Sequence, residues 1–282
     1  MSAGSAPVVP FRTSGAGSPL FCFPGSGGDA QVFQEMVAAL PEGQPVYAID
    51  MGWLCEARED FTVEHLAAIY LDRIRAIQQH GPYYLCGYSF GGLVAYEMAR
   101  RLLEEGDRAS LVALLDAPNP AQMSNLSATD NLRFRKTYLA DRLKRYALQL
   151  VRGDFKAFTA RAWAFVISRA GKLLLPAIKR VFRLLKRPLP ITLRSNDPSF
   201  LKAWSAYVPK PYARDVVCFR VADRGPEHGR DPSMGWEKCV TGGVHVHLIP
   251  ADHVDMMLMP SVGVLAEKLA TYLDSGSARR GG

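Results

Sequence analysis

Residues 83–92 read YYLCGYSFGG, and this stretch decides the fold. Its first half, Tyr83–Gly87, is apolar and aromatic, which is typical of a buried strand. Apolar residues at helical spacing follow at once in Phe90–Glu105, so a helix is expected directly after the strand. The segment between them matches the G-x-S-x-G pattern, in which a serine sits on a tight strand-to-helix turn and its hydroxyl projects above the carboxyl edge of a sheet. The sequence therefore predicts that Ser89 is a nucleophile.

Short apolar segments alternate with helical segments on both sides of this stretch. Such alternation is typical of parallel strands joined by crossover helices. The expected strands are Leu20–Phe23, Val46–Asp50, Tyr83–Gly87, Ser110–Leu115, Val216–Ala222 and Val244–Ile249, and the expected helices are Thr62–Gln78, Phe90–Glu105 and Val262–Leu273. We therefore predict an α/β fold, with a mostly parallel central sheet and helices on both faces, as a single domain over residues 1–282.

The alternation stops between residues 117 and 196, where helical patterning continues without a convincing strand. We expect a helical lid inserted into the sheet, here called the lid insertion. Its residues 131–195 hold 17 Lys and Arg against two acidic residues, a net charge of +15, whereas the whole chain carries +7. Such uneven charge indicates an anionic partner for the basic segment, and a merely solvated helical face is the alternative.

Other features of the sequence argue against several classes of protein. The N-terminus has no cationic start followed by an apolar run, and no stretch reaches the roughly 18–20 continuous apolar residues of a membrane span. There are five cysteines, and Cys22, Cys86 and Cys218 lie in apolar, strand-like segments. They are expected to be reduced core residues, not a disulfide framework or a metal cluster. These features predict a cytoplasmic enzyme without a metal ion.

A serine hydroxyl needs a base within hydrogen-bond reach before it can attack. Among six histidines, His253 directly follows the last expected strand, at the edge of the sheet from which Ser89 emerges. We expect His253 to be the general base. A carboxylate must orient its imidazole, and both Asp116 and Asp223 end strands on that edge, whereas Asp50 ends an earlier strand and is less favoured. The strand ends alone leave Asp116 and Asp223 as alternatives.

Four segments resemble the thioesterase domains, of the α/β-hydrolase superfamily, that end nonribosomal peptide and polyketide assembly lines. They are PLFCFPGSGG, YYLCGYSFGGLVAYEMARRL, LVALLDAPNP and HLIPADHVDMM. The similarity runs through most of the chain and fades in the lid insertion. In that family the acid follows the strand next after the nucleophile, and Asp116, within LLDAPNP, matches this position. The resemblance therefore implies a Ser89–His253–Asp116 triad, with Asp223 as the alternative acid.

The resemblance also implies a reaction. It is the release of an acyl, polyketide or peptidyl chain from the phosphopantetheine arm of a carrier protein, through an acyl-enzyme on Ser89, by hydrolysis or cyclisation. No cofactor of the chain itself is implied. The alternatives are an esterase or lipase acting on oxygen esters, a stand-alone editing thioesterase, and a non-catalytic relative, which the complete triad disfavours.

Two backbone amides are expected to bind the negatively charged oxygen that forms during such a reaction. One belongs to Phe90, the residue after the nucleophile, and the other to Ser26, in the glycine-rich turn after Leu20–Phe23. That turn lacks the spacing and the lysine of a phosphate-binding loop. The sequence therefore favours an oxyanion hole over a nucleotide site.

The basic lid insertion suits an acidic carrier protein as partner, since opposite charges steer such encounters. Residues Lys172–Arg187 are basic and amphipathic, which is also typical of contact with a membrane surface. No recognised nucleic-acid-binding fold surrounds the charge, so nucleic acid is not expected as a partner.

Overall fold

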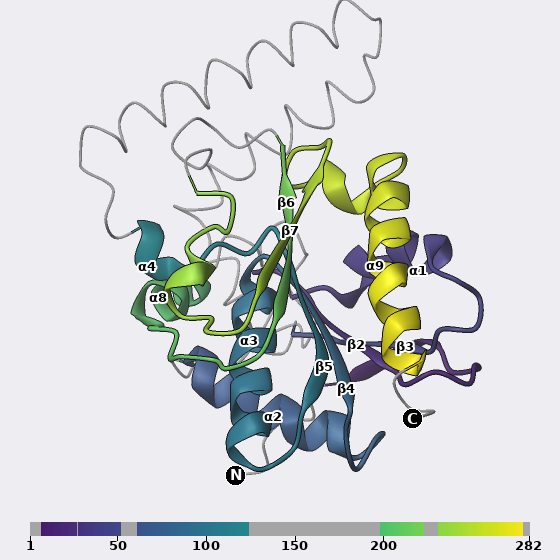
Figure 1. Cartoon of the computed structure of the whole chain (residues 1–282), viewed down its shortest axis with the longest axis horizontal. Helices are drawn as coiled ribbons and strands as arrows, with labels where there is room; N and C mark the ends of the chain where they lie inside the picture. The colour runs from purple at the N-terminus through teal and green to yellow at the C-terminus, as the bar shows by residue number, and fades with distance from the viewer. Residues whose placement is uncertain (1–6, 27, 52–60, 124–197, 223–230, 279–282) are drawn as a thin grey trace, which may run out of the picture.

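The computed structural model of the protein describes residues 7–26, 28–51, 61–123, 198–222 and 231–278 (Figure 1). A seven-stranded sheet runs through this part of the chain in the order β1-β3-β2-β4-β5-β6-β7. Its strands are β1 (Val8–Arg12), β2 (Leu20–Phe23), β3 (Val46–Ile49), β4 (Tyr83–Tyr88), β5 (Ala109–Leu115), β6 (Val216–Val221) and β7 (Val244–Ile249). β1 pairs with β3 in antiparallel fashion, and every other pair of neighbours is parallel. The mostly parallel sheet is therefore confirmed.

Helices cover both faces of this sheet, as predicted (Figure 1). One hydrophobic core joins the sheet to α2 (Val63–Arg75), α3 (Phe90–Glu104) and α8 (Pro198–Ala206). The other joins it to α1 (Gln34–Ala39) and α9 (Ser261–Ala278). The remaining elements are short: η1 (Ala30–Phe33), α4 (Pro120–Met123), η3 (Trp236–Lys238) and η4 (Asp255–Met257).

The central strands explain why this arrangement is stable. Every residue of β2, β4 and β6 is buried, as expected of parallel strands with helices on both faces. Successive side chains alternate between the two cores: Phe21 and Phe23 enter the first, and Leu20 and Cys22 the second. The four cysteines in the described part of the chain are buried free thiols, as predicted for three of them. Burial raises the pKa of the Cys22 thiol well above its usual value.

Several elements differ from the sequence expectations. β1 and α1 were not expected, because β1 is a half-buried edge strand containing a proline and α1 has only six residues. α9 continues through Ala278, beyond the Leu273 end that was expected. Of the lid insertion, only residues 117–123 are described. The lid itself and the single-domain organisation stay predictions.

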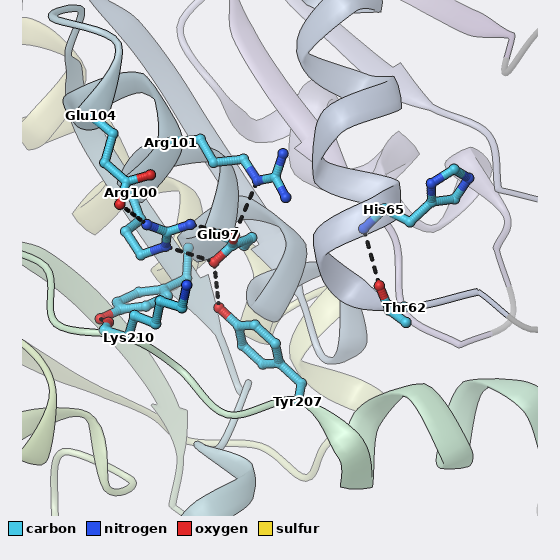
Figure 2. A network of polar contacts seen from close by, with 9 residues as sticks. Thr62, His65, Glu97, Arg100, Arg101, Glu104, Tyr207 and Lys210 are labelled. Atoms are coloured by element: carbon cyan, nitrogen blue, oxygen red, sulfur yellow. Dashed lines mark hydrogen bonds and ion pairs between the residues drawn. The ribbon is translucent and has the colours of Figure 1, made fainter.

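A buried ion-pair network fixes the chain that follows α8 to α3 (Figure 2). Glu97 on α3 pairs with Arg100 at 2.7 Å and with Arg101 at 3.0 Å. The Tyr207 hydroxyl, just after α8, donates a hydrogen bond of 3.1 Å to the same carboxylate. Burial alone opposes ionisation of Glu97, but the hydrogen bonds from Arg100 and Arg101 outweigh it and lower the pKa of this carboxyl. The return from the lid insertion is thereby tied to the helix that begins at the predicted nucleophile.

Glu97→Gln should lower the free energy of unfolding by about 3 kcal/mol at pH 7, because Arg100 would stay buried without its main carboxylate partner. Tyr207→Phe, the control, removes one hydroxyl from the same network and should cost about 1 kcal/mol. Since the folded-state pKa of Glu97 is lowered, its contribution is present at neutral pH and is lost as the pH falls through that value. The difference in urea unfolding between wild type and variant should therefore begin to narrow as the pH falls below the ordinary Glu pKa of about 4.3, and it should vanish below the lowered folded-state pKa. Equal free energies of unfolding for wild type and Glu97→Gln at pH 7 would contradict a stabilising role of the Glu97 network.

Candidate active site

Ser89 forms the turn between β4 and α3. Its φ of 54° and ψ of −119° lie in a region that residues other than glycine rarely occupy. Its backbone N–H donates to the carbonyl of Leu115 at 2.8 Å, and its carbonyl accepts from the N–H of Gly92 at 3.0 Å. The strained turn is thus held both by the neighbouring strand and by the first turn of the helix. The side chain is only half-buried and lies at the carboxyl edge of the sheet.

Close backbone packing surrounds this turn. A Cβ atom on Gly91 would lie 2.0 Å from the carbonyl oxygen of Phe23, at the end of β2. A Cβ atom on Gly92 would lie 2.3 Å from the Cβ of Ala117, the residue after Asp116. Real Cβ atoms do not approach other atoms so closely, so both positions require glycine. The start of α3 therefore packs directly on the ends of β2 and β5.

The predicted acid and base are brought together. His253 Nδ1 lies 2.5 Å from Asp116 Oδ2, although 137 residues separate them in the chain. Asp116 is fully buried, whereas the His253 side chain is 40% exposed. The second carboxylate oxygen of Asp116 accepts from the N–H of Val221 at 3.3 Å. Because a carboxylate accepts from Nδ1, this nitrogen carries the proton and Nε2 keeps its lone pair.

Of the other two candidate acids, only Asp50 is described, and it does not take this place. Asp223 lies outside the described residues. Asp50 follows β3, and two strands, β2 and β4, separate β3 from β5 in the sheet. Asp116 instead ends β5, and its N–H is fixed to the carbonyl of Phe219 on β6 at 2.7 Å. The carboxylate that meets His253 is therefore the one on the strand next to the nucleophile's strand.

Tyr88 holds the histidine loop and was missed by the sequence reasoning. Its ring stacks on the His253 imidazole with centroids 5.0 Å apart and planes inclined by 22°. Its hydroxyl donates a hydrogen bond of 2.7 Å to the His253 carbonyl. The G-x-S-x-G pattern leaves the position before the serine open, so the motif gives no signal for this contact. Asp252 adds support, because its carboxylate accepts from the N–H groups of Val254 and Asp255.

The two predicted oxyanion residues flank Ser89 from different elements. Phe90 is the first residue of α3, where backbone N–H groups have no acceptor within the helix. Ser26 lies in the turn after β2, which is closed by a 2.9 Å hydrogen bond from Gly28 N–H to the carbonyl of Gly25. A Cβ atom on Gly25 would lie 3.2 Å from the Cβ of Ser89, so this turn rests against the nucleophile. The donor roles of Ser26 and Phe90 stay a prediction.

The site lies where the order of strands in the sheet reverses. β2 and β4 are neighbours, whereas β3, between them in sequence, lies on the outer side of β2. Open α/β sheets bind ligands in the crevice at such a point, beyond the carboxyl ends of the strands. The N-terminus of α3 also points there, and its dipole favours negative charge. A serine, a histidine–aspartate pair and a helix N-terminus are the parts that nucleophilic acyl transfer requires.

The described part of the chain offers neither a metal site nor a membrane-spanning helix. There, no three His, Cys, Asp or Glu side chains are grouped so as to hold a metal ion. None of the helices described is both long and apolar enough to span a membrane.

A sequence model of the family described as thioesterase domain matches residues 18–271. Malpibaldin synthetase of Mortierella alpina is 27% identical over 270 residues, which cover 94% of this chain and 4% of that protein. The non-reducing polyketide synthase crz7 of Cladonia metacorallifera is 28% identical over 272 residues, which cover 90% of this chain and 12% of the synthase. The chain thus spans a small part of the length of the curated relatives it matches.

Solved structures share the fold. The NocB thioesterase domain from the nocardicin cluster has a TM-score of 0.61 and 20% identity, over 95% of this chain and 99% of that one. The four-domain nonribosomal peptide synthetase holo-AB3403 has a TM-score of 0.65 and 22% identity, over 94% of this chain and 20% of that one. The α/β-hydrolase fold expected from the sequence is therefore confirmed.

The contact between the start of α3 and the loop after β5 can be tested by adding a methyl group at Gly92 and removing one at Ala117. Gly92→Ala should lower the free energy of unfolding by about 2 kcal/mol, because its new Cβ meets the Cβ of Ala117. Adding Ala117→Gly removes that Cβ and should restore more than half of the loss. Urea unfolding of wild type, both single variants and the double variant measures the coupling. Strictly additive losses would show that the two residues do not pack together.

Proposed function

Because this chain belongs to the thioesterase domain family, we propose that it releases an acyl, polyketide or peptidyl chain from the phosphopantetheine arm of a carrier protein through an acyl-enzyme on Ser89. The names of the relatives support this substrate class, since they are nonribosomal peptide and polyketide synthases. The reacting bond is then a thioester, and the leaving group is the thiol of the arm.

The observation that carries the proposal is the 2.5 Å contact between His253 and the fully buried Asp116. A buried carboxylate that accepts from Nδ1 fixes the orientation of the imidazole and stabilises its protonated form. Nε2 is then the nitrogen that serves the reacting groups. Ser89 and this pair follow β4, β5 and β7, whose carboxyl ends share one edge of the sheet.

In the first half of the reaction, His253 Nε2 removes the proton from the Ser89 hydroxyl as its oxygen attacks the thioester carbonyl. The negative charge that forms on the carbonyl oxygen is stabilised by the N–H groups of Phe90 and Ser26 and by the dipole of α3. When the tetrahedral intermediate collapses, the carbon–sulfur bond breaks and the protonated His253 gives its proton to the thiol. Ser89 then carries the acyl chain as an oxygen ester.

In the second half, His253 acts as a base again. It removes a proton from water, which gives a free acid, or from a nucleophile of the acyl chain itself, which gives a ring. The new attack passes through the same oxyanion site. When this second intermediate collapses, the bond between the acyl carbon and the Ser89 oxygen breaks, and His253 gives its proton to that oxygen. Both outcomes need the same residues of this chain, so the choice between them depends on how the bound chain folds and on how well water is excluded.

Ser89→Ala should lower kcat by a factor on the order of 10⁶, because no acyl-enzyme can form. A fluorophosphonate, the class of reagent to which a NocB thioesterase structure is covalently bound, should add one phosphonyl group to the wild type and none to the variant. Intact-protein mass spectrometry measures this adduct, and hydrolysis of a small soluble thioester measures kcat.

Ser205→Ala is the matched control, since Ser205 is an exposed serine on α8. It should be labelled and turn over like the wild type. A Ser89→Ala enzyme that stays within about tenfold of wild-type turnover would refute the nucleophile. Faster turnover of an oxygen ester than of the matching thioester would favour an esterase instead.

The basic part of the lid insertion supports a carrier protein as partner. Residues 131–195 carry a net charge of +15, which an acidic carrier protein would complement. Exposed complementary charges mainly speed up encounter, and salt screens them over about 8–10 Å. The proposed docking would therefore change how fast the carrier protein is encountered. It involves no cofactor and leaves the chemistry at Ser89 unchanged.

Reversal of basic residues should separate docking from chemistry. Replacing Arg133, Arg135, Lys136, Arg142, Lys144 and Arg145 with Glu should raise KM for a carrier-bound thioester by about tenfold, because the carrier would be repelled. The KM for a small soluble thioester, which needs no docking, should stay unchanged. The carrier reaction of the wild type should also slow as salt is added, when followed at fixed pH.

Kinetics that respond neither to salt nor to these reversals would remove carrier docking from the proposal. Binding to vesicles of anionic lipid that depends on residues 172–187 would instead assign the charge to a membrane surface.

A further inference from the structure

Trp236 links α3, the helix that begins directly after Ser89, to residues 117–119. These residues follow Asp116 and are here called the acid loop. Trp236 lies in η3 and is fully buried. Its indole N–H donates a hydrogen bond of 2.7 Å to the carbonyl of Ala117, the residue after Asp116. Its ring packs against Tyr96 of α3, with centroids 4.5 Å apart. One side chain therefore contacts both elements that carry the proposed catalytic groups.

The segment around Trp236 also forms hydrogen bonds with the acid loop at a second point. Asn119 donates from its backbone N–H to the carbonyl of Met234 and from its side chain to the carbonyl of Gly235, both at 3.0 Å. Asn119 is itself buried. The acid loop is thus bound at residues 117 and 119 by one short stretch, residues 234–236.

That stretch has an unusual backbone. Met234 and Gly235 both have a positive φ, of 55° and 87°. For Met234, which has a Cβ atom, the left-handed conformation is unfavourable and needs support from its surroundings. Asp231 stabilises the turn, because its carboxylate accepts from the N–H groups of Ser233 at 2.9 Å and Gly235 at 2.8 Å. The turn thereby places the carbonyls of Met234 and Gly235 and the indole N–H of Trp236 within hydrogen-bond distance of the acid loop.

The acid loop needs such support. Asp116 also has a positive φ, of 45°, a conformation that is uncommon outside glycine even though aspartate adopts it more readily than most residues. Gly92 packs on Ala117 from the side of α3, and the indole of Trp236 holds the Ala117 carbonyl. If the carbonyl were released, Asp116 could relax toward an ordinary φ, and its carboxylate would turn away from His253.

We propose that Trp236 is a positioning residue, which holds Asp116 in the backbone conformation that presents its carboxylate to His253. The inference rests on the proposed role of Asp116 in the triad. It goes beyond that role because it assigns a task to a side chain that contacts neither His253 nor the substrate.

A double-variant cycle tests the inference. Trp236→Phe keeps an aromatic ring but removes the donor, and it should lower kcat on a small soluble thioester by about tenfold, while KM changes by less than about twofold. In an Asp116→Asn background the same change should alter kcat by less than about twofold, because the carboxylate that Trp236 positions is already gone. Asp116→Asn alone should lower kcat by about 10⁴.

Tyr83→Phe is the control for the loss of one side-chain donor that binds the backbone. The Tyr83 hydroxyl donates to the carbonyls of Gln78 and Gln79, both at 3.0 Å, at the start of β4 and far along that strand from Ser89. This variant should lose stability comparable to that of Trp236→Phe and keep its kcat within about twofold. Asn119→Ala is a second test, which should also lower kcat and should also lose its effect in the Asp116→Asn background.

The outcomes separate the two proposals. Equal losses from Trp236→Phe in both backgrounds, or a fall in kcat for Tyr83→Phe as large as for Trp236→Phe, would overturn the positioning role alone. Full activity of Asp116→Asn would overturn the proposed acid, and the inference with it. If Trp236→Phe does not fold, Asn119→Ala takes its place in the cycle, and additive losses there would overturn the inference.

Discussion

The turn at Ser89 brings three backbones into contact, and the rest of the site depends on that contact. Ser89 passes from β4 into α3 with a positive φ, so the helix starts directly over the ends of β2 and β5. Gly91 meets the Phe23 carbonyl on one side, and Gly92 meets Ala117 on the other. A side chain at either glycine would push α3 away. Ser89, the N-terminus of α3 and the loop after Asp116 are therefore placed by one packing constraint.

Hydrogen bonds along the carboxyl edge extend this constraint across the sheet. Ser89 N–H binds the last residue of β5, Asp116 N–H binds Phe219 of β6, and Ala222 N–H binds Ile249 of β7. Each strand end is thus fixed to the next, up to the loop that carries His253. The carbonyls of Leu115 and Phe219 belong to buried residues, so breaking the bond from Ser89 or from Asp116 would leave unsatisfied polar groups. The spacing of the proposed triad is therefore a property of the sheet more than of the individual loops.

Burial is divided unequally between the acid and the base. Asp116 is fully enclosed and its two oxygens accept from His253 and Val221, so its orientation is fixed. His253 is 40% exposed, which leaves the imidazole accessible to reacting groups. Tyr88 compensates for that exposure by stacking on the imidazole and binding the His253 carbonyl. A fixed acid and an accessible base suit a reaction in which the histidine must exchange protons with two different partners.

Residue patterns alone predicted the fold class, which the structure confirms, and they predicted Ser89 as nucleophile and His253 as base. Strand-to-helix alternation and the G-x-S-x-G turn are local patterns, and local patterns are readable because periodicity and glycine requirements act within a few residues. The sequence also placed Asp116 and Asp223 on strand ends, and the choice of Asp116 over Asp223 rested on family resemblance. Trp236 lay in a stretch to which no element had been assigned. Its significance, like that of Tyr88, comes from contacts with residues more than 100 positions away.

Only the tertiary structure decided which carboxylate meets His253 and what holds it there. The contact between Asp116 and His253 depends on the order of strands in the sheet and on the path of the loop after β7, neither of which a local pattern encodes. The hydrogen bonds between residues 234–236 and the loop after Asp116 likewise depend on the tertiary structure. They join two segments that are far apart in the sequence and have no common pattern. Sequence patterns specify which residues face the core or the edge of the sheet. Which of them touch across that edge is set by long-range packing.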